Sequence, residues 1–291
     1  MRPRFLSLRV RAPLGLLFLL CFFAAWSPAW HQQTVESNEK RIAALSPAER
    51  AYERFRFWRT QLPEDQRVPD LLPRYRAYLK QRRFSPSEID EQLKLVESQG
   101  QRAEVDRWNR ILTSETPAFN TKPNEFLVEI ARNRKPGTAL DVGMGQGRNA
   151  IWLAQQGWDV TGFDPAEKAV ALAQNTAARL GVKIHTEIKG TETFDFGDRR
   201  WDLILISYAG GRGMTDQVQR ALRPGGILII ESFHHDATKG TSIGEGVVFD
   251  TGDLPKLFPA LRVVRYEEPV VKADFGPGMT RVVRYCGTLP E

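Results

Sequence analysis

The fold is decided by the stretch Ala139-Leu-Asp-Val-Gly-Met-Gly-Gln-Gly-Arg-Asn149. It begins as a short apolar strand that ends in an acid, and Gly143, Gly145 and Gly147 then lead into a helix. Glycines let the backbone turn through positive φ and let a ligand approach where a Cβ atom would collide. The pattern therefore predicts a ligand-binding turn between a strand and a helix.

The glycine spacing and the next acid define the kind of ligand. A dinucleotide fingerprint has the spacing G-x-G-x-x-G, and here Arg148 stands where the third glycine would be. A helix is expected from Asn149 to Gln156, followed by a strand from Trp158 to Phe163. Asp164 comes next, 23 residues after Asp141, at the place where Rossmann-like folds bind ribose hydroxyls. We therefore expect Asp164 to bind a nucleoside.

The rest of this half of the chain alternates between strands and helices, which predicts a mostly parallel sheet with helices on both faces. Pro165 is expected to open a helix that runs to Leu180. The chain then departs from the alternation with two strands separated by a loop, which predicts an antiparallel hairpin at one sheet edge. The further strands are expected at residues 182–188, 201–207, 227–230, 261–266 and 280–286, with a helix at 215–222 and a turn at 223–226.

The run D-x-G-x-G-x-G resembles the first motif of class I S-adenosylmethionine-dependent methyltransferases. Trp201-Asp202 before a buried strand and the L-R-P-G-G turn at 222–226 also fit that family, and the resemblance covers roughly residues 115–287. The most similar branch acts on small molecules and includes the tellurite-resistance and thiopurine methyltransferases. The resemblance implies a Rossmann-like doubly wound sheet and S-adenosylmethionine as cofactor. It implies cofactor-binding roles for Asp141, Gly143, Gly145, Gly147 and Asp164.

The adenine and acceptor ends of the site are less well defined. The family often has an acid after its third strand, and here the stretch is Lys189-Gly-Thr-Glu-Thr-Phe194, so Thr191 or Glu192 is the candidate for the adenine contact. The loop before the first strand commonly closes over the cofactor in this family, so Asn120 and Asn124 are candidates for polar contacts. Residues that carry chemistry are expected past the carboxyl ends of the fourth and fifth strands: Ser207, Tyr208, Glu231, His234 and His235.

Among these, Ser207 is assigned to cofactor binding, and Tyr208 and His234 are the candidate catalytic residues, expected to shape the acceptor pocket. A metal site is not expected, because the adjacent side chains of His234 and His235 point to opposite sides of an extended segment. The leading function is methyl transfer to a small-molecule acceptor. The alternatives are a non-catalytic binding or interaction protein on the same fold and, more distantly, a nicotinamide enzyme.

The N-terminus carries a second pattern. Residues 12–30 contain no charge and follow four arginines, and no acid occurs before Glu36. This predicts a secretory signal peptide or a membrane anchor in residues 1–30. Without the four arginines the net charge of +6 falls to +2, so no nucleic-acid partner is expected. Positive charges stay in the cytoplasm, which would place the domain on the opposite side from the cell's supply of S-adenosylmethionine. The side of the membrane is left open.

Residues 31–115 are charged and helical in pattern. Two capping boxes, Ser46-Pro-Ala-Glu49 and Ser85-Pro-Ser-Glu88, each predict a helix start, and Asp70 is expected to cap a short helix between them. This region is interpreted either as a packing extension on the catalytic domain or as a functional cap or partner-binding surface. The chain is thus divided into a leader at 1–30, a helical extension at 31–115 and a catalytic domain at 116–291. Cys21 and Cys286 imply no disulfide framework.

Overall fold

The structure is a computed structural model, and the residues it describes are 44–62, 71–238, 243–276 and 278–291. Residues 47–291 form one compact unit. The predicted boundary near residue 115 falls inside this unit and stays a prediction. The hydrophobic segment at 12–30 and the expected cap Asp70 lie outside the described residues. Among the helices of the described ranges, none is long and apolar enough to cross a membrane.

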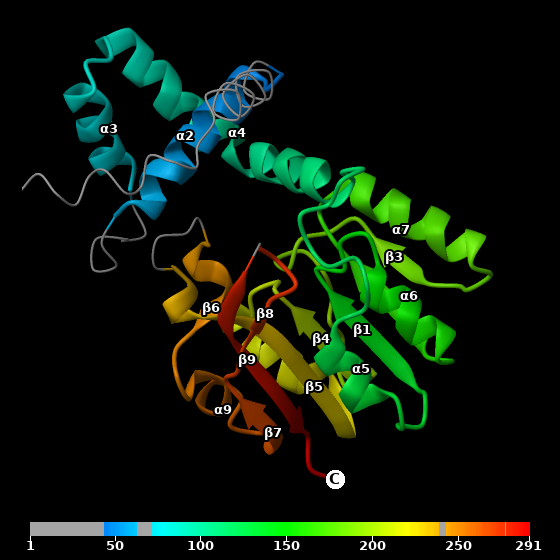
Figure 1. The fold of residues 1–291 in the computed structure, drawn as a ribbon. Coiled ribbons are helices and arrows are strands. Elements are labelled where there is room, and N and C mark those ends of the chain that lie inside the picture. The colour runs from blue at the N-terminus through cyan, green and yellow to red at the C-terminus, as the bar shows by residue number, and fades with distance from the viewer. Residues whose placement is uncertain (1–43, 63–70, 239–242, 277) are drawn as a thin grey trace, which may run out of the picture. The chain divides into compact units, whose positions relative to one another are not determined.

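A mixed sheet forms the centre of the catalytic domain, with the strand order β3-β2-β1-β4-β5-β9-β7 (Figure 1). The first five strands of this order are parallel, and β9 and β7 are antiparallel to their neighbours. This confirms the expected Rossmann-like sheet with an antiparallel edge. The strands are β1 (Thr138–Val142), β2 (Asp159–Phe163), β3 (His185–Glu187), β4 (Trp201–Ser207), β5 (Leu222–His234), β6 (Val248–Phe249), β7 (Arg262–Glu267), β8 (Val270–Lys272) and β9 (Met279–Thr288).

Helices cover both faces of this sheet, because its central strands are apolar on both sides. On one face Phe126 and Leu153 pack against Leu203, and on the other Val218 and Phe258 pack against the opposite side of the sheet. The helices are α5 (Glu125–Ala131), α6 (Arg148–Gln155), α7 (Glu167–Arg179), α8 (Thr215–Ala221) and α9 (Asp253–Leu257), with short 3-10 turns η2 (Arg212–Met214), η3 (His235–Thr238) and η4 (Glu245–Val247).

The region before the sheet is helical, as the capping boxes predict. Its helices are α2 (Pro47–Thr60), α3 (Leu72–Gln81) and α4 (Pro86–Leu112). Ser85 caps α4 through a complete capping box with Glu88. Gly100 in the middle of α4 is closely approached by Tyr52 of α2, since an added Cβ would lie 3.2 Å from the Tyr52 ring.

Three local predictions were inaccurate. Pro165 does not open α7, because Ala166 is the cap residue and follows it. The third strand is only three residues long. The fifth strand is much longer than 227–230, because β9 pairs with it as far as Phe233. The expected turn at 223–226 is retained as a bulge inside β5, since Trp201 pairs with Leu222 and Leu203 pairs with Ile227.

Candidate functional site

The glycine turn after β1 has the backbone that its sequence predicts. Gly143, Gly145 and Gly147 have φ values of 64°, 56° and 79°, which side chains rarely adopt. A Cβ atom on Gly143 would lie 2.6 Å from the Ala209 Cβ, and one on Gly147 would lie 2.7 Å from the Ala173 Cβ. The turn therefore requires glycine both for its conformation and for the space around it.

Asp164 fixes this turn from the end of β2. Its carboxylate accepts a hydrogen bond from the Gly145 N–H at 3.0 Å and another from the Ala166 N–H at 2.8 Å. A carboxylate offers about four acceptor positions, so it retains capacity for the hydroxyls of a sugar. The side chain is buried, which raises its pKa.

Asp141 lies at the end of β1 and is almost fully buried. One of its oxygens, Oδ2, accepts no hydrogen bond from the described residues. Burial raises the pKa of Asp141 to about 7, although the nearby guanidinium of Arg148 opposes this shift. A buried acid without a full set of partners is suited to meet a polar or cationic group of a ligand.

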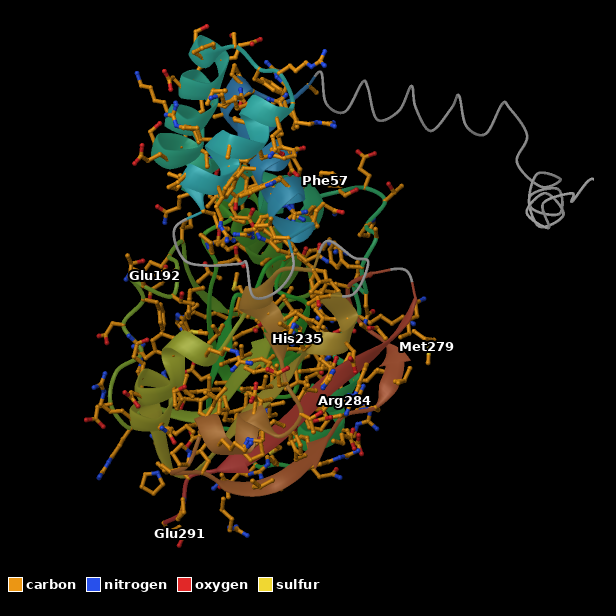
Figure 2. All side chains as sticks on the ribbon, turned by 90° about the vertical axis from the view of Figure 1, so that its left-hand side faces the viewer. Phe57, Glu192, His235, Met279, Arg284 and Glu291 are labelled. Carbon is orange, nitrogen blue, oxygen red and sulfur yellow. The ribbon has the colours of Figure 1, made fainter. Side chains whose placement is uncertain are left out.

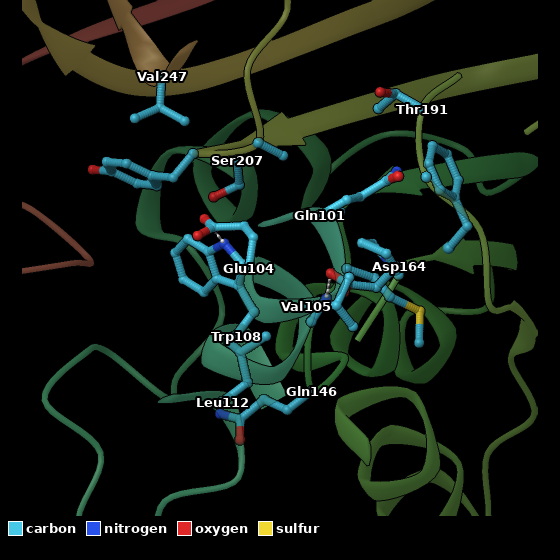
Figure 3. Close-up of a pocket in the computed structure, with 18 of the residues that line it drawn as sticks. Gln101, Glu104, Val105, Trp108, Leu112, Gln146, Asp164, Thr191, Ser207 and Val247 are labelled. Atoms are coloured by element: carbon cyan, nitrogen blue, oxygen red, sulfur yellow. Dashed lines mark hydrogen bonds between the residues drawn. The ribbon is translucent and has the colours of Figure 1, made fainter. Parts of the chain in front are cut away.

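A cavity of about 710 Å³ opens above the carboxyl ends of β1, β2 and β4 (Figure 3). Its floor contains the glycine turn and Asp164, and its opposite wall is the face of α4. The volume lies in the range of ligand-binding pockets. The residues from α2 and α4 that line it are Tyr52, Phe55, Val96, Gly100, Gln101, Glu104, Val105, Trp108 and Leu112.

Most of the predicted cofactor residues meet at this cavity. Those that line it are Gly143, Gly145, Asp164, Thr191, Glu192 and Ser207. Glu192 is exposed, at the outside of the domain (Figure 2). Gly147 and Asp141 are not among the lining residues. They lie behind the turn, where Gly147 caps α6 and Asp141 is buried.

Tyr208 also lines the cavity and has an unusual backbone. Its φ of 56° is in the left-handed region, which is strained for a residue with a side chain. Its hydroxyl donates a hydrogen bond to Glu231 Oε1 at 2.9 Å, and its ring packs against Phe233 and Phe275. Burial and the Glu231 carboxylate raise the pKa of Tyr208 far above its usual value, so the phenol is held in its neutral form.

Asn120 and Asn124 do not line the cavity. Instead, each donates a hydrogen bond to Asp274, and Asn124 also donates to Glu231 Oε1 at 2.7 Å. Asp274 further pairs with Arg148 at 2.7 Å, just after the glycine turn. The two asparagines thus hold the loop before β1 in a buried polar network behind the cavity.

His234 and His235 are likewise outside the set of residues that line the cavity. His234 is the last residue of β5, and its Nε2 lies 3.1 Å from the Thr251 hydroxyl. His235 Nδ1 lies 2.8 Å from Asp250. Glu231, expected past the end of the fifth strand, is inside it, because pairing with β9 extends β5. The geometry gives His234 no position in the acceptor pocket.

Sequence reasoning missed the cavity residues from α4. The region that contains Trp108 and Leu112 was interpreted as a packing extension or as a functional cap or partner-binding surface, and neither residue was named as part of the site. Trp108 contacts Phe275, which stacks on Phe119, so this end of the cavity is aromatic. The sequence does contain a sign of it, because Gln101, Glu104 and Trp108 recur on one helical face whose other members are apolar.

The fold is Rossmann-like, and its glycine turn and the acid after β2 occupy the place where such folds bind a nucleoside. Residues 139–226 match the protein family described as methyltransferase domain. The chain therefore carries a class I S-adenosylmethionine-dependent methyltransferase domain, and the expected cofactor class is confirmed with it.

Known relatives agree with this assignment. The probable S-adenosyl-L-methionine-dependent methyltransferase TehB of Haemophilus influenzae is 36% identical over 62 residues, which is 21% of this chain and 22% of the relative. Ribosomal RNA small subunit methyltransferase C of Alcanivorax borkumensis is 32% identical over 104 residues, covering 32% of this chain and 31% of the relative. This chain thus spans less than a third of the length of either relative.

A solved structure shows the same fold. The N-methyltransferase NodS of Bradyrhizobium japonicum, in complex with S-adenosyl-L-homocysteine, superimposes with a TM-score of 0.52 at 18% sequence identity. The superposition covers 64% of this chain and 98% of NodS.

Proposed function

We propose that this protein transfers a methyl group from S-adenosylmethionine to a small-molecule acceptor. The observation that carries the proposal is one cavity that joins the glycine turn and Asp164 to an aromatic end at Trp108, Tyr208 and Phe275. The first part has the groups that a nucleoside and an amino acid require. The second part offers an enclosed apolar space for an acceptor.

The chain's own residues fit the cofactor at several points. The remaining acceptor positions of Asp164 suit the ribose hydroxyls. Thr191 and Glu192 line the cavity where the adenine contact is expected. When bound, the cofactor would supply an electrophilic methyl group on its sulfonium: an acceptor atom would bond to the methyl carbon as the carbon–sulfur bond breaks, and S-adenosyl-L-homocysteine would leave.

The protein's contribution to the reaction is placement. The strained backbone of Tyr208 fixes its ring beside the cavity, and its hydroxyl is held by Glu231. Positioning the acceptor in a space that excludes water lowers the barrier without a strong base. A thiol or metalloid acceptor requires no general base, whereas an oxygen acceptor must lose a proton. General-base catalysis of that proton transfer typically raises the rate by about 10²–10⁴-fold.

The decisive experiment measures the melting temperature of residues 47–291 with and without S-adenosylmethionine. A ligand at about 100 times its dissociation constant adds about 2.7 kcal/mol to stability, which is readily seen as a shift in melting temperature. Asp164→Ala should abolish most of that shift. Asp159→Ala is the matched control, because Asp159 is an exposed acid at the opposite end of the same strand. Equal shifts in wild type and Asp164→Ala would contradict the assigned ribose contact.

Methyl transfer is tested separately from cofactor binding. Wild-type protein is offered a panel of thiol, amine, phenol and metalloid acceptors with labelled cofactor. Turnover of at least one class is expected. Cofactor binding without methylation of any acceptor would favour the alternative of a non-catalytic binding protein on this fold.

We also propose that residues 12–30 deliver the chain to a membrane, on the basis of their length and the arginines before them. Full-length protein should remain in the membrane pellet after carbonate extraction, and a chain that starts at Glu36 should not. If both are extracted with an intact N-terminus, the proposal fails. Mass spectrometry of the N-terminus distinguishes cleavage from retention.

A further inference from the structure

One carboxylate in the cavity, that of Glu104, is not among the residues that the sequence assigned to cofactor binding. Glu104 lines the cavity from α4, and its Oε1 accepts a hydrogen bond from the Trp108 indole N–H at 2.9 Å. Its other oxygen, Oε2, has no hydrogen bond within 3.5 Å from the described residues. The Tyr52 hydroxyl of α2 is its neighbour, and burial together with the Glu104 carboxylate raises the pKa of Tyr52 to about 12. A buried carboxylate oxygen without a donor is costly unless a ligand supplies one.

Glu104 lies at the aromatic end of the cavity. Figure 3 shows Glu104 and Trp108 toward Ser207 and Val247, with Asp164 and Thr191 on the other side. The ring contacts give the same placement, because Trp108 contacts Phe275, and Phe275 contacts Tyr208 after β4. The free oxygen is therefore on the acceptor side.

Charges around the cavity favour a cation at this place. The charged residues that line it are the three acids Glu104, Asp164 and Glu192 and the single cation Arg148. Arg148 is already paired with Asp274 at 2.7 Å. An anionic group beside Glu104 would be repelled by its carboxylate, whose one nearby cation, Arg107, is shared with Glu53, whereas a cation would be attracted both by the carboxylate and by the faces of the aromatic rings.

The structural alternative is that Glu104 only joins α4 to α2. Arg107 is the cation nearest to it, with Nη1 3.7 Å from Oε1, and the same guanidinium lies 3.4 Å from Glu53 of α2. Arg107 is thus shared between two acids and approaches the oxygen that Trp108 already occupies. The Arg107 contacts and the neighbouring Tyr52 hydroxyl explain the position of Glu104, but neither makes a hydrogen bond to Oε2 within 3.5 Å.

We propose that Glu104 binds a cationic nitrogen of the acceptor, so that the substrate is an amine-bearing small molecule with an apolar or aromatic body. The inference rests on the proposed function and names its substrate class. Glu104 selects the acceptor and holds it. The atom that receives the methyl group is a separate question.

The test measures binding rather than turnover. The full chain is saturated with S-adenosyl-L-homocysteine, and calorimetry measures the affinities of phenethylamine, tyramine and tryptamine and of their alcohol and carboxylate analogues. Amines should bind about tenfold tighter than their alcohols, the usual size of a hydrogen bond to a charged group. Glu104→Gln keeps an oxygen for Trp108 and should reduce this preference to about twofold or less.

Glu97→Gln is the matched control, since Glu97 is an exposed acid on the same helix outside the cavity. It should leave the amine preference unchanged. Three results would overturn the proposal. The wild type could bind none of the amines, it could bind amines and carboxylates with equal affinity, or the Glu104→Gln and Glu97→Gln variants could behave alike. Glu104→Gln could instead weaken the binding of S-adenosylmethionine while its affinities for S-adenosyl-L-homocysteine and for the amines stay unchanged. This result would also overturn the proposal, because Glu104 would then face the sulfonium of the cofactor. If the wild type fails to bind S-adenosyl-L-homocysteine, the proposed function itself fails.

Discussion

The two walls of the cavity are built in different ways. The wall after β1 and β2 consists of the glycine turn and the Asp164 carboxylate that fixes it, and Gly143 and Gly145 put no side chain into the cavity. The wall from α4 consists of side chains, among them Glu104 and Trp108, and reaches the site only because α2 and α7 hold the helix in place. Arg102 of α4, for example, pairs with Glu167 of α7 at 2.7 Å.

This difference separates recognition of the cofactor from recognition of the acceptor. A wall built on a glycine turn tolerates almost no substitution at its glycines, because its shape depends on positive φ. A side-chain wall can change its chemistry one residue at a time without disturbing the turn. We therefore expect changes in the first wall to abolish cofactor binding and changes in the second to alter acceptor choice.

The largest effect is expected for Gly145→Val. A valine backbone is strained at the φ of 56° that this position requires. The valine Cβ would lie 3.3 Å from the Leu112 side chain of α4, and its two methyl groups would extend further. S-Adenosylmethionine binding should be undetectable by calorimetry. Gly181→Val is the control, since Gly181 has a φ of 69° and no neighbour within 4 Å of an added Cβ. Normal binding by Gly145→Val would show that the turn does not contact the ligand.

Asp141 should make stability depend on pH. Burial raises its pKa to about 7, so between about pH 4 and pH 7 the folded protein holds a proton that the unfolded chain has lost. Stability should therefore fall as pH rises through this window, by at most about 1.4 kcal/mol per pH unit from this group. Denaturant titrations across the window should show a shallower fall in Asp141→Asn. An unchanged slope would mean that Asp141 is ionised throughout.

Trp108→Phe should have a smaller and more selective effect. It removes the indole N–H that holds Glu104 but keeps an aromatic ring beside Phe275. Loss of one such hydrogen bond is worth about 1 kcal/mol, so acceptor affinity should fall several-fold. Affinity for S-adenosyl-L-homocysteine should stay within about twofold. A large loss of cofactor affinity would break the proposed separation between the two walls.

His234→Ala should change the site least. His234 is buried at the end of β5 near Thr251 and Glu268 and does not line the cavity. We expect a loss of about 1–2 kcal/mol in unfolding free energy from the missing contacts and no change in cofactor affinity. Turnover of the best acceptor should be unaffected. A marked fall in turnover with normal folding would restore the sequence-based assignment of His234 to the acceptor pocket.

The sheet could be predicted because nearby residues in the sequence specify most of its strands and turns. The glycine turn, Asp164 and the apolar run of β4 each specify their own conformation within a few residues. The length of β5 could not be predicted in this way, because its second half is fixed by pairing with β9, far along the chain. That one error misplaced both Glu231 and His234.

The acceptor end of the site could be predicted only in part. Tyr208 follows a strand that the sequence shows clearly, and it does line the cavity. The role of Glu104 depends on how a distant helix packs over the sheet, and helix periodicity alone cannot distinguish a cavity wall from a buried face. Asn124 illustrates the reverse case, since its loop was recognised but its bonds go to Glu231 and Asp274, which come from later parts of the chain.

The position of β9 between β5 and β7 also affects biosynthesis. A chain leaving the ribosome presents β1 to β5 before β9, so one edge of β5, including Ile229, is unpaired until β9 has emerged. Arg148 beside the glycine turn likewise acquires Asp274 only at that late stage. A nascent chain that pauses before β9 exposes an apolar strand edge, which is the kind of surface that chaperones bind and that aggregates. The pairing that surrounds the glycine turn is therefore completed only when the segment from Asp274 through β9 has been made.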